Sequence, residues 1–254
     1  MTIHRLIQGE RGTSLVELMV ASLVFSLVAA SGMRFLVLQQ QWAVRQEDTA
    51  EAQQQARAAL DFMSRELALL GFGVPKDEAG LLKATGQEVQ FLANIDASIA
   101  RFDQDAAAGE KQFAVAYINN QEKFVQGKTV SICGPDSCEW HSLARDGGSG
   151  TLEINEGLGK AFPSGSSIQI VKRLAYSLKP ADAAQFNLNR TVDGSANPVA
   201  EGLSSMSLEY LDGEGGVAAA LADIRRVRIR LTVPLPRNPE KTRSLSSEVY
   251  LRNG

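Results

Sequence analysis

The chain has 254 residues, of which 44% are hydrophobic, and its formal net charge is −3. This length and apolar content are enough for one sizeable packed domain or two small ones. The near-neutral charge argues against a protein that binds nucleic acid through charge alone, because such binding depends on clustered lysine and arginine.

A short, mildly basic segment precedes a long apolar run at the amino terminus. The segment, MTIHRLIQGERG, holds Arg5 and Arg11 against Glu10, and in residues 13–33 the single ionisable side chain is Glu17. As a helix this run is long enough to cross a hydrocarbon core of about 30 Å. The positive-inside rule then predicts that the basic segment stays in the cytoplasm.

An ordinary secretion signal is the alternative interpretation of this run. The small residues VAAS at Val28–Ser31 offer a cleavage site at its far end. Two features argue against it: a signal core rarely contains a carboxylate such as Glu17, and the helical pattern continues beyond Arg34.

Residues 35–70 contain neither proline nor glycine and are rich in good helix formers. Arg57, Asp61 and Arg65 are spaced four apart, which suits ion pairs on an exposed face. Apolar or small residues recur mostly at steps of three and four and predict a stripe that faces a partner surface: Phe35, Leu38, Trp42, Ala52, Ala56, Leu60, Met63, Leu67 and Leu70.

The sequence therefore predicts one helix over residues 13–70, which ends before the GFGVP of Gly71–Pro75. Its first part (13–38) is apolar on all sides and spans a membrane, and its second part (39–70) is an amphipathic continuation. A sustained coiled coil is the alternative for the second part, although its run of alanine and glutamine gives a weak seam.

The pattern changes from Glu88 onward to the alternation expected of short strands. The predicted fold class is α+β, with the long helix packed on the mostly antiparallel β-sheet of a head that covers residues 71–254. The inward-facing residues are Val89, Phe91, Phe113, Val115, Tyr117, Val130, Ile132, Leu152, Ile154, Ile168, Ile170, Val227, Ile229, Leu231 and Val233.

Cys133 and Cys138 flank GPDS, a turn-forming sequence that can bring the thiols together. In an exported chain they are expected to form a disulfide. Two alternatives remain open, two free thiols and a zinc site with His141 as a third ligand, although no fourth ligand is visible.

Arg226, Arg228 and Arg230 lie on one face of a predicted strand. Contact with DNA is one interpretation, but no aromatic side chains for base stacking lie between them. A solvent-exposed face or edge strand, protected from aggregation by its charges, is the preferred interpretation.

Residues for catalysis are scarce in this sequence. The two histidines are His4, in the basic amino-terminal segment, and His141, and GLGKAFPSGSS lacks the spacing of a phosphate loop. DGEGG at Asp212 is better explained as a turn between strands than as a calcium site. We therefore expect neither an enzyme nor a cofactor or metal.

Gly12, Thr13 and Glu17, with the apolar run that follows, resemble the processing signature of type IV prepilins and type II secretion pseudopilins. The resemblance implies that a prepilin peptidase removes leader residues 1–12, cuts between Gly12 and Thr13 and methylates the new amino terminus. The family most often has phenylalanine where this chain has Thr13, which makes the extent of methylation uncertain. The resemblance also implies that Glu17 pairs with the amino terminus of a neighbouring subunit during assembly.

Four further segments are similar to minor pilins of the PilW type and, in layout, to the J-type minor pseudopilin: residues 56–75, residues 200–215, IRRVRIRLTV and SSEVYLRNG. This similarity implies a minor subunit that helps to initiate a type IV pilus at the filament tip, with other pilins and an inner-membrane assembly platform as partners. It implies a single inner-membrane span with a periplasmic head, and later an extracellular pilus or a periplasmic pseudopilus. A secretion pseudopilin and a tip adhesin or DNA receptor remain the alternatives.

Overall fold

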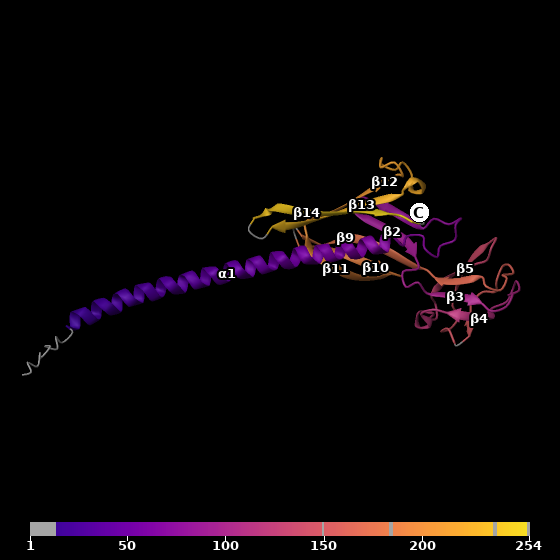
Figure 1. The fold of residues 1–254 in the computed structure, drawn as a ribbon, viewed down its shortest axis with the longest axis horizontal. Coiled ribbons are helices and arrows are strands. Elements are labelled where there is room, and N and C mark those ends of the chain that lie inside the picture. Colours follow the sequence, from indigo (N-terminus) through magenta and orange to yellow (C-terminus); the bar gives the residue numbers. More distant parts are fainter. Residues whose placement is uncertain (1–13, 149, 183–184, 236–237, 253–254) are drawn as a thin grey trace, which may run out of the picture. The chain divides into compact units, whose positions relative to one another are not determined.

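The computed structural model of the protein describes residues 14–148, 150–182, 185–235 and 238–252. The chain divides into two compact units, residues 1–49 and residues 50–254, and each is described by itself. One helix, α1 (Leu15–Leu67), begins in the first unit and ends in the second (Figure 1).

The first unit consists of the apolar part of α1. Its segment Leu15–Ala43 has a mean hydropathy of 2.0, is long and apolar enough to cross a membrane, and buries none of its side chains. The hydroxyls of Ser22, Ser26 and Ser31 donate to backbone carbonyls one turn earlier, at 2.7 to 2.9 Å. These polar groups are therefore satisfied within the helix, as a hydrocarbon environment requires.

The end of α1 differs from the prediction, which extended the helix to Leu70. The helix ends at Leu67 because the backbone tightens there: the N–H of Leu70 donates to the carbonyl of Leu67 at 3.0 Å. Gly71 then adopts a φ of 75° and donates its N–H to Leu92 at 2.9 Å. Only glycine takes this left-handed conformation without a steric cost, so the predicted stop signal is correct and the predicted range is three residues too long.

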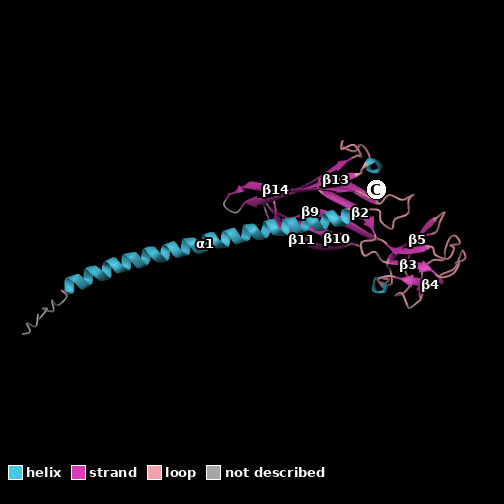
Figure 2. Cartoon of the chain, in the orientation of Figure 1, coloured by secondary structure: helices cyan, strands magenta, loops and turns pink. Residues whose placement is uncertain are grey.

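The second unit is rich in β-strands, and every strand pairing in its described residues is antiparallel (Figure 2). We call residues 50–93 and 172–252 the helix lobe. It holds a five-stranded sheet in the order β1-β2-β9-β10-β11 and a three-stranded sheet in the order β12-β13-β14. The strands are β1 (Leu81–Thr85), β2 (Glu88–Ala93), β9 (Lys172–Asp182), β10 (Gln185–Val192), β11 (Ser195–Leu203), β12 (Ser205–Leu211), β13 (Arg226–Leu235) and β14 (Asn238–Tyr250), with a short 3-10 helix, η2 (Leu221–Asp223).

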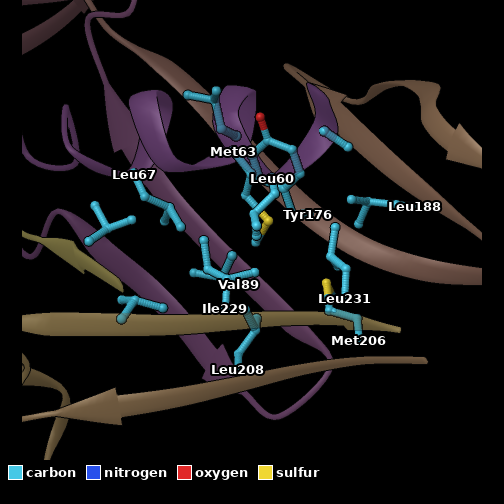
Figure 3. Close-up of a cluster of buried hydrophobic side chains, with 14 of the residues drawn as sticks. Leu60, Met63, Leu67, Val89, Tyr176, Leu188, Met206, Leu208, Ile229 and Leu231 are labelled. Atoms are coloured by element: carbon cyan, nitrogen blue, oxygen red, sulfur yellow. The ribbon is translucent and has the colours of Figure 1, made fainter. Parts of the chain in front are cut away.

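The core of the helix lobe joins the last turns of α1 to both sheets (Figure 3). The predicted stripe is confirmed from Ala56 onward, whereas Phe35, Leu38 and Trp42 in the first unit are exposed. Full burial of a leucine or methionine side chain contributes roughly 1.5 to 3 kcal/mol. The buried apolar residues of α1, among the side chains that the structure describes, are Ala56, Ala59, Leu60, Met63 and Leu67.

Residues 94–171 form a second part of the head, which we call the insert lobe. Its six-stranded sheet has the order β6-β5-β8-β3-β4-β7. It has a separate core without any described residue of α1, so the helix packs on the core of the helix lobe and not on this one. Its elements are β3 (Ile99–Phe102), β4 (Gln112–Ile118), η1 (Gln121–Lys123), β5 (Thr129–Cys133), β6 (Cys138–Ser142), β7 (Thr151–Glu153) and β8 (Ser167–Ile170).

Candidate functional site

The carboxylate of Glu17 lies in the first turn of α1 and caps its own helix. The N–H of Ser14 donates to Oε2 of Glu17 at 3.2 Å, and the N–H of Val16 approaches Oγ of Ser14 at 3.4 Å. This arrangement is a capping box, in which a serine and an acidic residue three positions later satisfy donors at the helix start. The positive end of the helix dipole also favours a negative charge at this position.

Apolar side chains surround this carboxylate along the helix. Leu15, Val16 and Leu18 are 76%, 66% and 66% exposed, so this surface is open to lipid or to other helices. The predicted cleavage and methylation residues, Gly12 and Thr13, lie outside the described residues. The described part of this site therefore consists of one capped carboxylate on an exposed apolar helix.

The two cysteines join the ends of β5 and β6 through a disulfide, Cys133–Cys138. The turn between these strands brings the thiols together, as GPDS predicted. His141 instead contacts Glu139, with 3.0 Å between Nε2 and Oε2, and Glu139 also accepts from the N–H of Gly159 at 2.8 Å. Among the residues that the structure describes, no cluster of three or more potential ligands supports the zinc alternative.

The arginine row lies on one face of the three-stranded sheet, among carboxylates of the neighbouring strands. Arg228 contacts Glu209 at 2.9 Å and Glu248 at 3.1 Å. Arg226 contacts Glu248 at 3.3 Å and lies over the ring of Tyr250 at 5.3 Å. The hydrogen bond that Arg228 donates to Glu209, followed by those that it donates to Glu248, raises the pKa of Arg228. Two of the three arginines are thus paired within the sheet, which supports the preferred interpretation over contact with DNA.

The acidic turn at Asp212 is held by its own side chain. Oδ1 of Asp212 accepts hydrogen bonds from the N–H groups of Glu214, Gly215 and Gly216, at 2.9, 2.7 and 2.8 Å. An aspartate that closes its own turn in this way explains the DGEGG sequence without a bound ion.

The sequence analysis missed a buried charged cluster between α1 and the five-stranded sheet. Glu66 accepts from Tyr176 at 2.5 Å and from two nitrogens of Arg190, at 2.8 and 2.5 Å. Burial, then the hydrogen bond to Glu66, raises the pKa of Tyr176, and the hydrogen bond to Glu66 raises that of Arg190. One signal was available: Glu66 follows Met63 by three positions and so lies on the apolar stripe.

A cleft of about 650 Å³ lies between the two lobes, directly after the end of α1. Its lining comes mainly from residues 70–76 and 78–81, with Cys133 and Gln169 from the insert lobe and Leu221 from the loop before β13. The cleft is mostly bounded by backbone and apolar side chains, so it suits an apolar group more than a charged one.

Comparisons with known proteins add no assignment to this geometry. Neither the known protein families nor the curated proteins contain a match to the sequence. The shared feature with pilins is therefore the layout alone, a long apolar amino-terminal helix followed by an antiparallel β-sheet head.

Proposed function

We propose that this chain is a minor subunit of a type IV pilin-type filament, of the PilW type, and that it acts in assembly rather than in catalysis. In this proposal a prepilin peptidase cuts between Gly12 and Thr13 and methylates Thr13. The subunit is held in the inner membrane by α1 with its head in the periplasm, and then enters the filament. One observation carries the proposal: Glu17, a carboxylate on an open apolar span, belongs to a helix whose other end packs in a β-rich head.

The cost of burying Glu17 gives this residue its role. A carboxylate costs about 2.5 to 3.5 kcal/mol on the insertion scale at the centre of a bilayer, which is the upper bound for Glu17 near the start of the span. The Ser14 N–H and the helix dipole offset part of this cost, but neither carries a full positive charge. Cleavage after Gly12 creates one, the amino group of Thr13. Pairing between this group on one subunit and Glu17 on a neighbour would stabilise a subunit that leaves the membrane for the filament.

The size of the head favours a minor subunit over a major one. The head from Gly71 to Gly254 comprises 184 residues (254 − 71 + 1). The insert lobe adds a second core to the one that contacts α1. Such bulk suits a subunit present once, at the tip or in an initiating complex, better than one that repeats along a shaft.

Mass spectrometry of the mature amino terminus tests the processing step. The expected chain starts at methylated Thr13, whereas a chain that starts after Ser31 would establish an ordinary secretion signal. Immunoblots of sheared filaments then test assembly: Glu17→Ala should reduce incorporation strongly. Glu10→Ala is the matched control, because its side chain is lost with the leader. Unchanged incorporation of Glu17→Ala would refute the role of the carboxylate.

A second candidate, recognition by the head at a filament tip, is favoured by the insert lobe. This lobe has its own core, and the cleft beside Cys133 and Gln169 lies at its junction with the helix lobe. Filaments whose subunit lacks residues 94–171 test this candidate. They should assemble normally and lose binding to cells or cargo if the lobe recognises a ligand, and binding that survives the deletion would count against it.

A further inference from the structure

Among the described residues, the rest of the head covers one edge strand of the three-stranded sheet, β12, and leaves the other, β14, uncovered. On β12, Leu208 donates its N–H to the carbonyl of Gly86 at 2.9 Å, and Tyr210 accepts from the N–H of Ala218 at 3.0 Å. On β14, no backbone hydrogen bond beyond the pairing with β13 joins the stretch 244–250 to any other described residue. The edge of β12 is covered, and that of β14 is open.

The strand register identifies which backbone groups of β14 face the open edge. Groups of successive residues in an antiparallel strand point alternately to either side. The backbone N–H and C=O of Leu208 point away from β13. Those of its β13 partner Ile229 therefore point toward β14, where Ile229 pairs with Ser247. The bond from the N–H of Leu251 to Arg225, at 2.9 Å, agrees with this alternation. The groups of Ser244, Ser246, Glu248 and Tyr250 therefore face outward.

This stretch carries one charged side chain, Glu248, and none of the other devices that keep edge strands apart. Proteins protect such edges with proline, lysine, bulges or a covering segment. The residues SLSSEVY contain neither proline nor lysine, and the pairing of β13 with β14 shows a register shift only at Pro234/Leu235. Seven consecutive residues thus offer a regular template for another strand.

One arginine beside this edge, Arg230, has no acidic partner among the described residues. Arg230 is exposed and lies between Ser207 on β12 and Ser246 on β14. Arg226 and Arg228, in contrast, both have acidic partners. Only the small side chain of Ser246 separates its guanidinium from the open edge.

We propose that β14 accepts an edge strand from a neighbouring, different filament subunit, and that this strand places an aspartate or glutamate beside Ser246 to pair with Arg230. Two strand spacings separate Arg230 from such a residue, roughly 10 Å between α-carbons, and extended arginine and glutamate side chains together bridge this span. Backbone hydrogen bonds supply the affinity and the ion pair selects the partner and the register.

A second copy of this chain fits the site less well than a different subunit. Within residues 244–250 of β14 the one acidic side chain is Glu248, and it is already held by Arg226 and Arg228. The same stretch from a second copy would therefore bring no spare carboxylate to Arg230. The neighbour is a filament subunit only if the proposed function holds, so this inference rests on it.

Site-specific photo-cross-linking in cells that make the filament tests the inference on the full chain. A benzophenone amino acid replaces Ser246 and, as the matched control on the same face at the covered edge, Ser207, the partner of Arg230 on β12. The Ser246 probe should give an adduct that mass spectrometry maps to a strand of another filament subunit with an aspartate or glutamate. The Ser207 probe should give none. Arg230→Glu should lower the adduct yield by about five-fold or more, and Arg230→Lys should retain it.

Reversing the charge of the mapped acidic residue should restore the adduct in the Arg230→Glu background. Equal yields from the two probes, an adduct only with a second copy, or insensitivity to Arg230→Glu would overturn the inference. Filament incorporation of every variant is measured in the same cells. Normal incorporation without an adduct refutes strand docking alone, whereas an adduct without incorporation refutes the proposed function and leaves strand docking supported. Retained resistance of the head to limited proteolysis verifies that each variant is folded.

Discussion

The buried cluster of Glu66, Tyr176 and Arg190 should make a large contribution to the stability of the head. Glu66→Ala removes the acceptor of three hydrogen bonds, two of them in a bidentate pair with Arg190. The hydroxyl of Tyr176 and the guanidinium of Arg190 then lose the carboxylate with which each is paired. The exposed fractions of the side chains decide the size of the effect, because they are only 9% for Glu66 and 20% for Arg190.

Breaking a buried ion pair from one side costs about 3 to 5 kcal/mol. Arg190 keeps some contact with water and lies over the ring of Phe62 at 5.2 Å, which places the expected loss for Glu66→Ala at the lower end, about 3 kcal/mol. Tyr176→Phe removes one hydrogen bond and should cost about 1 kcal/mol. The two changes share Glu66, so the double variant should lose less than the sum.

Pulse proteolysis of the full chain in detergent, over a series of urea concentrations, measures these losses in the free energy of unfolding. Lys83→Ala is the control, because its ion pair with Glu88 lies at the surface, with 46% and 26% of the two side chains exposed. That variant should lose less than about 1 kcal/mol. A loss for Glu66→Ala no greater than that of Lys83→Ala would refute the reasoning that burial gives this cluster its energy.

Three further predictions concern the rest of the head. Gly73 has a φ of 79°, and an added Cβ would lie 2.9 Å from a side-chain carbon of the insert lobe, so urea unfolding of Gly73→Ala should show a loss above about 1 kcal/mol. Gly86→Ala, which meets no atom within 4 Å, should be tolerated. Cys133→Ser opens the disulfide and should cost roughly 2 kcal/mol in the same assay. Hydrogen bonds, first from Lys83 and then from Gln90, lower the pKa of Glu88 below its ordinary value of 4.5. The contribution of the Glu88 carboxylate to the free energy of unfolding is therefore present above pH 4.5 and is lost as the pH falls through the lowered pKa. Unfolding measured from pH 6 to pH 3 should therefore show a shallower acid-side loss for Glu88→Gln than for the unaltered chain.

The correct parts of the fold prediction came mostly from the spacing of apolar residues along the sequence. The steps of three and four from Ala56 to Leu67 and the alternation from Val227 to Val233 both describe one buried face, and both are confirmed. Such patterns depend only on local geometry and on which side meets water. The disulfide was predictable for a similar reason, since a tight turn joins its two cysteines.

The division of the head into two lobes could not be predicted in this way. Strands of the helix lobe and of the insert lobe have the same alternation, and no local signal states that β2 pairs with β9 across the intervening residues. The Glu66 cluster depends on the same long-range pairing, because Tyr176 and Arg190 lie 110 and 124 positions away from Glu66. The candidate site is the opposite case, because its signal is local. Ser14 and Glu17 have the spacing of a capping box, which is visible in the sequence but was not used to predict the start of the helix.

The connection between the two lobes has a consequence for how this head can vary. Ala93 at the end of β2 is directly paired with Lys172 at the start of β9, so the 78 residues between them (171 − 94 + 1) leave and re-enter the sheet at one point. They are topologically the loop of a single β-hairpin, enlarged until it has a core of its own. We expect such a loop to behave as a cassette: its sequence can diverge, or be exchanged for a two-residue turn or an epitope, while the helix lobe stays unchanged.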